Sequence, residues 1–474
     1  MRTADAAELS ARGAAAEAGD RLALVAEGRR WTWAELAAAV GSECERLAAI
    51  GIPAADPPSL RVAFDAHPSA ESVIRLLALV EAGICAVPLD PRLPASARVE
   101  RVRLLAPLFD LDAEAAIEPP VGSPGLRWSS RPGVRAGEAT PLAVLFTSGT
   151  TGAPRAVELS RSAFRAAAAA AAARLGWEPD DRWLCCLPLA HVGGLSIIIR
   201  CLLGRRAVVL AGGFDAARVA GGLERDAVTL ASFVPTMLQR LFDADPYWRP
   251  PASLRAALLG GAPAGAGLWD EIERRGFPAR ATYGMTETCA QVATARAEAP
   301  RRLIPLDGVQ LRITRERIEV AGPTLCTRIG VEAAAADDGS WTRDGFLRTG
   351  DLGRRSDGAL EVTGRADGTI ITGGQNVVPA AVEAVLATHP AIRRAAVFGV
   401  PDQEWGELVG AVLEESGAVP RPDAAELRAW LASRLVSYER PRRVAWVRDL
   451  PENSSGKLDR AAARERWYRT MEIV

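Results

Sequence analysis

Short runs of Val, Ile and Leu recur along most of the chain, and each run is followed by a stretch with helical spacing. Residues 207–210 have the pattern of a buried strand, and residues 215–224 carry the apolar positions of one helix face. The alanine-rich stretch 166–173 is low in complexity, but alanine is the best helix former and arginines flank it, so we expect a helix there. This alternation predicts an α/β fold.

Clusters of proline and glycine mark the places where this pattern breaks. We expect the stretch 119–137 to be a surface connection between two halves of a large N-terminal domain. A second region is dense in glycine, a composition that suits tight turns and a hinge; its glycines are at positions 350, 353, 358, 364, 368, 373 and 374. The prediction is an N-terminal domain over residues 1–364, a hinge at 365–368 and a C-terminal domain over 369–474.

The C-terminal part has a mixed pattern of its own. Residues 379–389 and 424–435 have the spacing of helices, and residues 395–400 form an apolar run typical of a strand. A segment of roughly 100 residues is within the usual size of one domain. We therefore expect a small α+β domain at this end of the chain.

Length and composition exclude several classes of protein. A chain of 474 residues is too long for one ordinary core, and its net charge of −1 argues against nucleic acid as a partner. The seven cysteines show neither paired C-x-x-C spacing nor the density of a disulfide scaffold, so we expect them to be reduced. No apolar run approaches the roughly 20 residues that span a bilayer, and we expect a cytoplasmic protein.

The basic residues contain one exception. Of the 57 lysine and arginine residues, only Lys457 is a lysine. A high-GC genome explains the general excess of arginine, since either cation serves on a solvated surface, but it does not explain the exception. Chance survival of one surface lysine is the alternative to a chemical requirement at this position.

A loop rich in hydroxyl groups and glycine follows an apolar run at residues 145–155, with the sequence Leu-Phe-Thr-Ser-Gly-Thr-Thr-Gly-Ala-Pro-Arg. Glycines let backbone N–H groups approach phosphate oxygens, and Ser and Thr add donors without bulk. The terminal G-K-[ST] of a Walker A loop is missing, which disfavours P-loop hydrolase chemistry. The loop predicts a phosphate site, with an ordinary polar turn as the alternative.

Residues 283–287, Tyr-Gly-Met-Thr-Glu, combine an aromatic face, a hydroxyl and a carboxylate after a β-like stretch. Magnesium commonly takes only one or two protein carboxylates and completes its shell with water and phosphate, so Glu287 is a candidate ligand. Tyr283 is a candidate for stacking on a base. Taken alone, this segment is better explained as an exposed turn.

Three further motifs complete an ordered series: Leu-Arg-Thr-Gly-Asp at 347–351, Gly-Arg-Ala-Asp at 364–367, and the turn-rich loop 451–460 around Lys457. With them the chain resembles the adenylate-forming superfamily of acyl-CoA synthetases, peptide-synthetase adenylation domains and beetle luciferases. The resemblance extends from Trp-Ala-Glu-Leu at 33–36 to Arg460. It implies a large N-terminal domain of several subdomains and a small mobile C-terminal domain. It also implies activation of a carboxylic acid by ATP and Mg²⁺, then transfer to coenzyme A.

The resemblance implies roles for the matching residues that contact the nucleotide. Glu287 would bind Mg²⁺, Thr286 would contact the α-phosphate, and Asp351 would accept hydrogen bonds from the ribose with help from Arg365. The adenine would lie between Gly261, Ala262 and Tyr283. The β- and γ-phosphates would be surrounded by Thr147, Ser148, Gly149, Thr150, Thr151 and Gly152.

The resemblance also assigns the moving parts. Asp367 matches the hinge position, Gly374 lies in a segment similar to the one that lines the pantetheine tunnel, and Lys457 would bridge the substrate carboxylate and the α-phosphate. Attack of a carboxylate on phosphate brings two anions together, and a compact ammonium enters such a site more easily than a planar guanidinium. Loss of this contact should slow the step by about 10² to 10³. Acetylation of Lys457 should impair adenylation more than CoA transfer.

The acid pocket is less well defined. Residues 187–196 resemble the family motif in which His191 would border the pocket, although a structural histidine is the alternative. With residues 283–292, this segment is most similar to the o-succinylbenzoate–CoA ligase subgroup of menaquinone biosynthesis. That acid has a second carboxylate, which needs a polar anchor. Candidate anchors are Ser196, Arg200, Ser232, Thr288 and Gln291, and a solvated helix position is the alternative for Arg200.

Two departures from the family pattern leave questions open. Arg155 and Ala156 stand where relatives usually have Lys and Gly, and Glu439 follows Tyr438 where many relatives have lysine. Alternative functions are ligation of another aryl or medium-chain acid to CoA, or a catalytically silent nucleotide-binding homologue. A peptide-synthetase module is less expected because no carrier-protein domain follows, and no feature points to luciferase-like oxidation. A homodimer is a further possibility.

Overall fold

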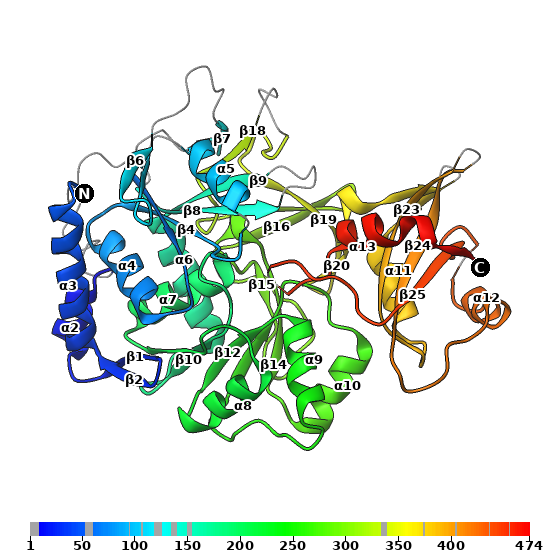
Figure 1. Ribbon diagram of the computed structural model, residues 1–474, viewed down its shortest axis with the longest axis horizontal. Helices are drawn as coiled ribbons and strands as arrows, with labels where there is room; N and C mark the ends of the chain where they lie inside the picture. Colours follow the sequence, from blue (N-terminus) through cyan, green and yellow to red (C-terminus); the bar gives the residue numbers. More distant parts are fainter. Residues whose placement is uncertain are drawn as a thin grey trace.

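The computed structural model shows a large N-terminal part joined to a smaller C-terminal part (Figure 1). The residues that it describes are 9–52, 60–93, 95–105, 108–117, 126–133, 140–148, 154–332, 339–372, 375–402, 405–435, 437–454 and 456–474. Among these residues, no helix is long and apolar enough to cross a membrane.

The first sheet has eight strands in the order β15-β14-β13-β12-β10-β11-β1-β2. Its central strands are parallel, and one strand at each edge is antiparallel. Most of the parallel strands, such as β11, β12 and β13, are short runs buried on both faces, as is usual for such sheets, whereas β14 is only partly buried. Their bounds are β1 Leu22–Ala26, β2 Arg29–Thr32, β10 Arg182–Cys185, β11 Ala207–Leu210, β12 Leu230–Phe233, β13 Ala256–Leu259, β14 Ala279–Tyr283 and β15 Ala293–Thr294.

The second sheet also has eight strands, in the order β6-β5-β3-β4-β8-β9-β18-β7. Its edge corrects one expectation. Part of the stretch 119–137, expected to be a surface connection, is strand β7, which pairs with β18 across the whole of its length. The bounds are β3 Arg61–Asp65, β4 Cys85–Leu89, β5 Leu108–Asp110, β6 Ala115–Ile117, β7 Leu126–Ser130, β8 Pro141–Ser148, β9 Pro154–Ser160 and β18 Arg328–Glu332.

The helices of the large part fill and cover these two sheets. Successive strand residues point to opposite faces, so Trp183 and Cys185 of β10 face the core shared by both sheets while Leu184 faces the outer helices. Caps fix several helix starts, for example a capping box between Thr32 and Glu35. The bounds are α2 Ala11–Ala18, α3 Trp33–Ala49, α4 Ala70–Glu81, α5 Ala95–Leu105, α6 Arg161–Leu175, α7 Val192–Gly204, α8 Ala216–Arg225, α9 Pro235–Ala244 and α10 Ala266–Arg275.

A four-stranded antiparallel sheet leads towards the small part: β16 Gln310–Thr314, β17 Arg317–Ala321, β19 Leu347–Ser356 and β20 Ala359–Arg365. It corrects the expectation that the glycines of this region mark turns. Gly358 does occupy a turn, with φ of +78°, but Gly353 and Gly364 lie inside strands. A Cβ on Gly364 would lie 2.0 Å from the Val378 side chain. These two glycines permit close packing.

The small part has its own core, separate from that of the large part. The predicted helices at 379–389 and 424–435 are present but end three residues earlier, in turns closed by Thr388 and Ser433. The α/β prediction is confirmed. The elements are η2 Ala366–Gly368, β21 Ile370–Thr372, β22 Gln375–Val377, α11 Pro379–Leu386, β23 Ile392–Asp402, β24 Gly406–Glu415, α12 Ala424–Ala432, β25 Arg443–Val447, α13 Arg460–Trp467, η3 Tyr468–Thr470 and β26 Glu472–Ile473.

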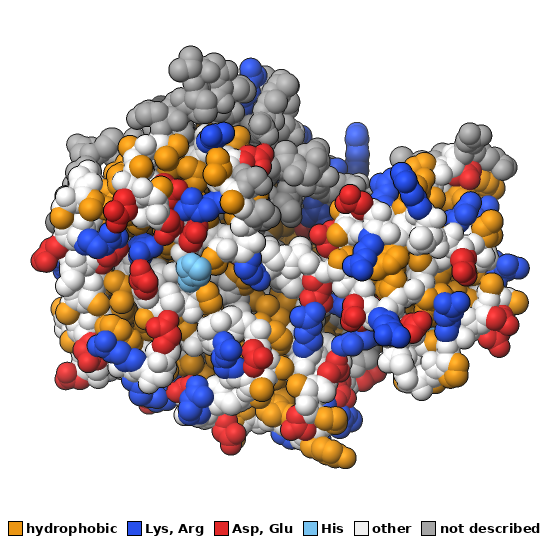
Figure 2. Space-filling view, viewed as in Figure 1, with side chains coloured by type: hydrophobic (Ala, Val, Ile, Leu, Met, Phe, Trp, Pro, Cys, Tyr) orange, Lys and Arg blue, Asp and Glu red, His pale blue; other side chains and the backbone are white. Residues whose placement is uncertain are grey.

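Charge is distributed without a dominant sign over the face in Figure 2, where basic and acidic side chains alternate over both parts. This distribution agrees with the net charge of −1. The visible face offers no extended basic surface for a polyanion.

Candidate active site

The predicted phosphate loop joins two antiparallel strands. Strand β8 ends at Ser148 and β9 begins at Pro154, and the register pairs these two residues as well as Thr147 with Arg155. Gly149, Thr150, Thr151 and Gly152 lie outside the described residues, and Ser148 is described by its backbone alone. The structure thus fixes the two ends of the loop, and the phosphate contacts stay predictions.

Three predicted nucleotide residues meet beside this hairpin. The Tyr283 hydroxyl donates to Asp351 Oδ2 at 2.7 Å, and Arg365 Nη1 lies 3.2 Å from Asp351 Oδ1. Antiparallel pairing of β19 with β20 places Asp351 opposite Arg365. Burial, together with the neighbouring Asp351 charge, raises the pKa of Tyr283, so the phenol stays a hydrogen-bond donor. Residues from three separate motifs therefore share one polar cluster.

Glu287 belongs to the short 3₁₀ helix η1, Thr286–Thr288, which contacts β9. Burial raises its pKa, while the positive charges of Arg155 and Arg365 oppose the shift. A buried carboxylate is favoured by a nearby cation. No group of three or more His, Cys, Asp or Glu side chains that could hold a metal occurs in the described part of the chain. The role of Glu287 as a Mg²⁺ ligand stays a prediction.

Arg155 replaces the lysine usual in the family and makes a contact of its own. Its Nη2 donates to Ser340 Oγ at 2.9 Å, which links β9 to the segment that precedes β19. The charge at this position is kept, and the guanidinium contributes to the positive potential at Glu287. Its effect on the reaction stays an open prediction.

Lys457 reaches this cluster from the small part. Its loop is closed by hydrogen bonds between Asn453 and Lys457 and by a positive φ of +75° at Gly456. A Cβ on Gly261 would lie 2.9 Å from Lys457 Cε and 3.4 Å from Nζ. Burial lowers the pKa of Lys457, the Asp351 charge raises it, and Arg365 lowers it. The sole lysine thus lies, partly buried, against Gly261, a contact that sequence reasoning missed because it assigned Gly261 to the adenine alone.

Ala262 follows Gly261 in the loop after β13 and lies on the surface of the protein. Gly374 lies outside the described residues, and Asp367 is described by its backbone alone, within η2. Glu439 lies between α12 and β25. The roles predicted for Ala262, Gly374 and Asp367, and the effect of the departure at Glu439, are therefore not tested by a contact.

His191 occupies the N-cap position of α7, where its Nε2 lies 3.8 Å from Asp90 Oδ2. This nitrogen is buried and has no hydrogen-bond partner in the described part of the chain. Asp90 is held by Arg92, at 2.8 and 2.9 Å, and Arg92 also donates to the carbonyl of Ser454 in the Lys457 loop. Burial lowers the pKa of His191, which favours the neutral ring.

Four of the five candidate anchors for a second carboxylate use their polar atoms within the fold. Ser196 donates to the Gly193 carbonyl, Ser232 accepts from Trp183, and Thr288 donates to the Met285 carbonyl. The amide nitrogen of Gln291 donates to Thr294 at 2.7 Å, and its amide oxygen has no hydrogen-bond partner in the part of the chain that the structure describes. A carboxylate needs a hydrogen-bond donor or a cation, so the amide oxygen of Gln291 does not anchor one.

Arg200 is the exception, and the structure overturns its alternative interpretation as a solvated helix residue. Its exposed fraction is 3%, because α7 is buried on nearly all sides. Nε and Nη2 have no hydrogen-bond partner among the residues that the structure describes, and the guanidinium lies 5.6 Å from the centre of the Trp183 ring. Burial lowers the pKa of Arg200 to about 10, so it stays charged at neutral pH. A buried cation with free donors is suited to an anionic ligand.

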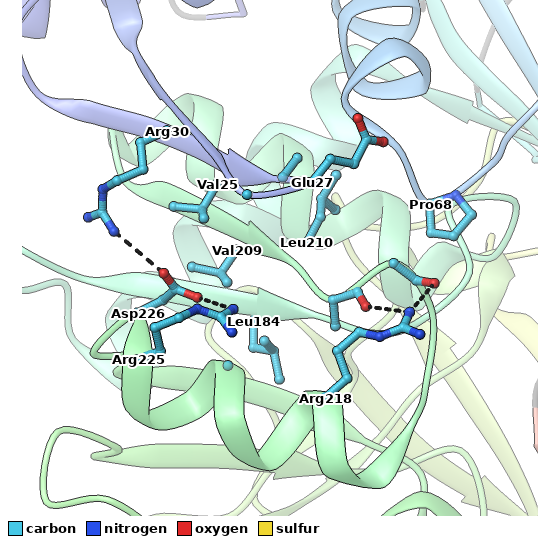
Figure 3. Close-up of a pocket in the computed structure, with 15 residues that line it drawn as sticks. Val25, Glu27, Arg30, Pro68, Leu184, Val209, Leu210, Arg218, Arg225 and Asp226 are labelled. Atoms are coloured by element: carbon cyan, nitrogen blue, oxygen red, sulfur yellow. Dashed lines mark hydrogen bonds and ion pairs between the residues drawn. The ribbon is translucent and has the colours of Figure 1, made fainter.

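A hollow lies between β1, β11 and α8, away from the predicted site, and none of its lining residues belongs to that site (Figure 3). Its volume is about 670 Å³. Asp226 accepts from Arg225 at 2.8 Å and from Arg30 at 3.4 Å, while Arg218 donates to two backbone carbonyls. Its arginines and Asp226 are therefore paired with one another or with the backbone.

Comparison with known proteins agrees with the geometry. Residues 11–322 match the family of AMP-binding enzymes, and residues 381–457 match the AMP-binding enzyme C-terminal domain. The chain therefore belongs to the AMP-binding enzyme family. A 2-succinylbenzoate–CoA ligase from Bacillus pumilus is 32% identical over 478 residues, which cover 95% of this chain and 96% of the relative. The predicted superfamily is confirmed, and the predicted hinge lies between the two matched segments.

Solved structures give the same result. The o-succinylbenzoate CoA synthetase MenE from Bacillus subtilis, in complex with the acyl-adenylate intermediate OSB-AMP, has a TM-score of 0.80 at 30% identity and covers 96% of this chain and 97% of its own. The complex of MenE with ATP and magnesium has a TM-score of 0.81 at 30% identity, with coverages of 95% and 98%. A double mutant of MenE bound with the product analogue OSB-NCoA scores 0.65 at 31% identity, with coverages of 96% and 97%.

Proposed function

We propose that this chain joins o-succinylbenzoate to coenzyme A in two steps, with ATP and CoA as co-substrates. In the first step a carboxylate oxygen bonds to the α-phosphorus of ATP and the bond to pyrophosphate breaks. In the second the CoA thiol loses its proton, sulfur bonds to the acyl carbon, and the bond to AMP breaks. The observation that carries the choice of acid is the buried Arg200 with unpaired donors.

Arg200 favours a dicarboxylate for an electrostatic reason. Only one carboxyl group of o-succinylbenzoate is activated, and the other needs a cation to replace the water that it loses on binding. Arg200 is buried in α7, the helix that begins after His191. Benzoate or octanoate has no second charge and would leave the guanidinium uncompensated. The similarity to 2-succinylbenzoate–CoA ligases over 95% of the chain supports the same choice.

The first step is assigned to residues around Tyr283 and Glu287. We propose that Asp351 and Arg365 hold the ribose, that Thr286 contacts the α-phosphate and that the phosphate loop from Thr147 holds the terminal phosphates. Glu287 would hold Mg²⁺, which supplies charge neutralisation at the phosphates. Lys457 would place its ammonium between the substrate carboxylate and the α-phosphate, where negative charge accumulates.

We assign the second step to a rotation of the small part relative to the large part. We propose a boundary at residues 365–368, with movement about Asp367 that withdraws Lys457 and brings Gly374 to the CoA tunnel. The short η2 between β20 and β21 supports this boundary, because it separates the last strand of the large part from the first strand of the small one. His191, whose pKa is lowered by burial so that the neutral ring is favoured, would border the acid.

The substrate is tested by CoA-dependent release of AMP over a panel of acids. We expect o-succinylbenzoate to give the highest kcat/KM, with benzoate and octanoate much lower. Preference for either monocarboxylic acid would reject the proposed substrate while keeping the ligase chemistry. Absence of acid-dependent exchange of pyrophosphate into ATP with every acid would instead favour a silent nucleotide-binding homologue.

We also propose that the enzyme acts in the cytoplasm, where ATP and CoA are both available, and that it forms a homodimer. Cell fractionation tests the location. Sedimentation at several concentrations tests the dimer, and a single monomeric species throughout would contradict it.

A further inference from the structure

One face of α9 contacts the small part along its whole length. Thr236, Arg240 and Asp243 are spaced four and three residues apart, so their side chains share a face of the helix. In Figure 1 the red loop that precedes α13 leaves the small part and runs to the centre of the molecule, above α9. All three side chains bind residues of the small part.

The first two contacts are with the loop that carries Lys457. The Thr236 hydroxyl donates to the carbonyl of Gly456, the residue before the lysine. Arg240 Nη2 donates to Glu452 Oε2 at 2.7 Å, and Glu452 begins the same loop through its bridge to Leu458. Both ends of the Lys457 loop are therefore attached to a single helix of the large part.

The remaining contacts reach the body of the small part. Asp243 Oδ2 accepts from Arg393 Nη2 at 2.5 Å, and Arg393 is the second residue of β23. The other oxygen of Glu452 accepts from Arg394 at 2.7 Å, and Arg394 binds Glu414, which is 1% exposed. Glu452 is therefore anchored in its own domain. The contact with α9 orients the whole small part as well as its loop.

We propose that the face of α9 formed by Thr236, Arg240 and Asp243 is a docking strip that positions Lys457 for adenylation and releases it for CoA transfer. This inference rests on the two-step function proposed above. Arg240 and Asp243 act as positioning residues, because they hold the loop and domain from which Lys457 extends to Gly261.

The chemistry of the strip suits a contact that forms and breaks. The side chains of Arg240, Asp243 and Arg393 are 53%, 44% and 42% exposed, whereas that of Glu452 is 12% exposed. Ion pairs with exposed partners are individually weak and screened by salt. Their polarity is crossed: α9 offers a cation and then an anion, and the small part offers an anion and then a cation. This order fixes one orientation, since any shift along the helix opposes like charges.

The main test is the charge reversal Arg240→Glu, which faces Glu452 with a second carboxylate. Pyrophosphate–ATP exchange should fall about tenfold because like charges now oppose docking. Formation of thioester from preformed acyl-adenylate and CoA should be unchanged or faster. Lys457 should react several-fold faster with an amine reagent, and the labelled peptide is identified by mass spectrometry because no other lysine exists.

The matched control is Arg274→Glu. Arg274 is also 53% exposed and paired at 2.5 Å, but its partner Glu271 lies in the same helix, α10. This variant should leave both half-reactions and the labelling rate unchanged. A second pair allows rescue: Asp243→Arg and Arg393→Asp should each impair exchange, and the double variant should recover much of it.

Equal loss of both half-reactions in Arg240→Glu, or an unchanged rate of Lys457 labelling, would overturn the docking strip. So would a double variant no better than the worse single one. Amine labelling needs no turnover, so it tests docking even if the parent chain activates none of the acids. Failure of the proposed function is a separate outcome. In that case the unsubstituted chain shows no exchange of pyrophosphate into ATP with any acid.

Discussion

The surroundings of Arg200 and the hollow beneath α8 differ in a way that volume does not reveal. The hollow is large, at about 670 Å³, and has three arginines at its rim, but each of them already binds Asp226 or backbone carbonyls (Figure 3). Arg200 is buried and His191 is partly buried, and each has a buried nitrogen with no hydrogen-bond partner among the described residues. Unpaired buried groups identify a ligand site better than empty space does.

The largest expected effect distinguishes the predicted active site from the hollow, and it follows from removal of the Lys457 ammonium. In Lys457→Met, acid-dependent pyrophosphate exchange should fall by about 10² to 10³, because a preorganised cation at the reacting phosphate is lost. Thioester formation from preformed acyl-adenylate should be retained. Arg225→Met, at the rim of the hollow, should leave both half-reactions unchanged, and equal loss in the two variants would erase the distinction.

The next test compares two arginines. Arg200→Gln should lower kcat/KM for o-succinylbenzoate by about 10², since the second carboxylate loses a buried charged partner. Activity with benzoate should change little, so the preference between the two acids should collapse. Arg218→Gln is the control in the hollow, where the guanidinium binds only carbonyls. If Arg200→Gln keeps its selectivity, another residue anchors the second carboxylate.

Alanine substitutions at two glycines of similar backbone conformation distinguish the effect of conformational strain from the effect of contact with Lys457. Gly261 has a φ of +82° and Gly28, in the hollow, a φ of +78°. Each substitution by alanine should destabilise the fold by about 1 kcal/mol. A Cβ at 28 meets nothing within 4 Å, whereas a Cβ at 261 meets Lys457. Only Gly261→Ala should slow pyrophosphate exchange, by about tenfold; a similar loss in Gly28→Ala would show that strain alone is responsible.

The smallest effect concerns pH. Burial lowers the pKa of His191 from 6.5, so the unfolded chain binds a proton at a higher pH than the folded one. The folded state should therefore lose stability as the pH falls below 6.5, at most by about 1.4 kcal/mol per pH unit for this group. The measurement is the midpoint of urea unfolding between pH 7.5 and 5.5 in the parent and in His191→Gln. Identical slopes would exclude this contribution.

Patterns of local sequence predicted a large share of this structure. The strand at 207–210 and the helix that begins after Asp215 follow their hydrophobic spacing, and Asp215 caps that helix. Local patterns failed at β7, because an edge strand between glycine-rich stretches is stabilised by β18, which lies about 200 positions away along the chain. Glycines packed inside β19 and β20 were read as turns for the same reason, since sequence does not show what approaches them.

The site was predicted to a similar extent. Ordered motifs indicated Tyr283, Asp351 and Arg365, which the fold brings into one cluster. They did not distinguish Arg200 from four other candidate anchors, because the choice depends on which polar groups the fold leaves unpaired. The contacts of α9 with the small part were also missed. Arg240 and Asp243 resemble any solvated pair of charges until tertiary structure brings Glu452 and Arg393 beside them.

Arg200 also bears on the balance between stability and selectivity. A buried guanidinium without an anion is unfavourable for the free protein, and apolar residues of similar size often stabilise such positions. An Arg200→Met chain should therefore melt at a higher temperature than its parent in the absence of substrate, while o-succinylbenzoate should raise the melting temperature of the parent more. The residue that selects the acid thus makes the free fold less stable, and selection for heat resistance alone would tend to remove it.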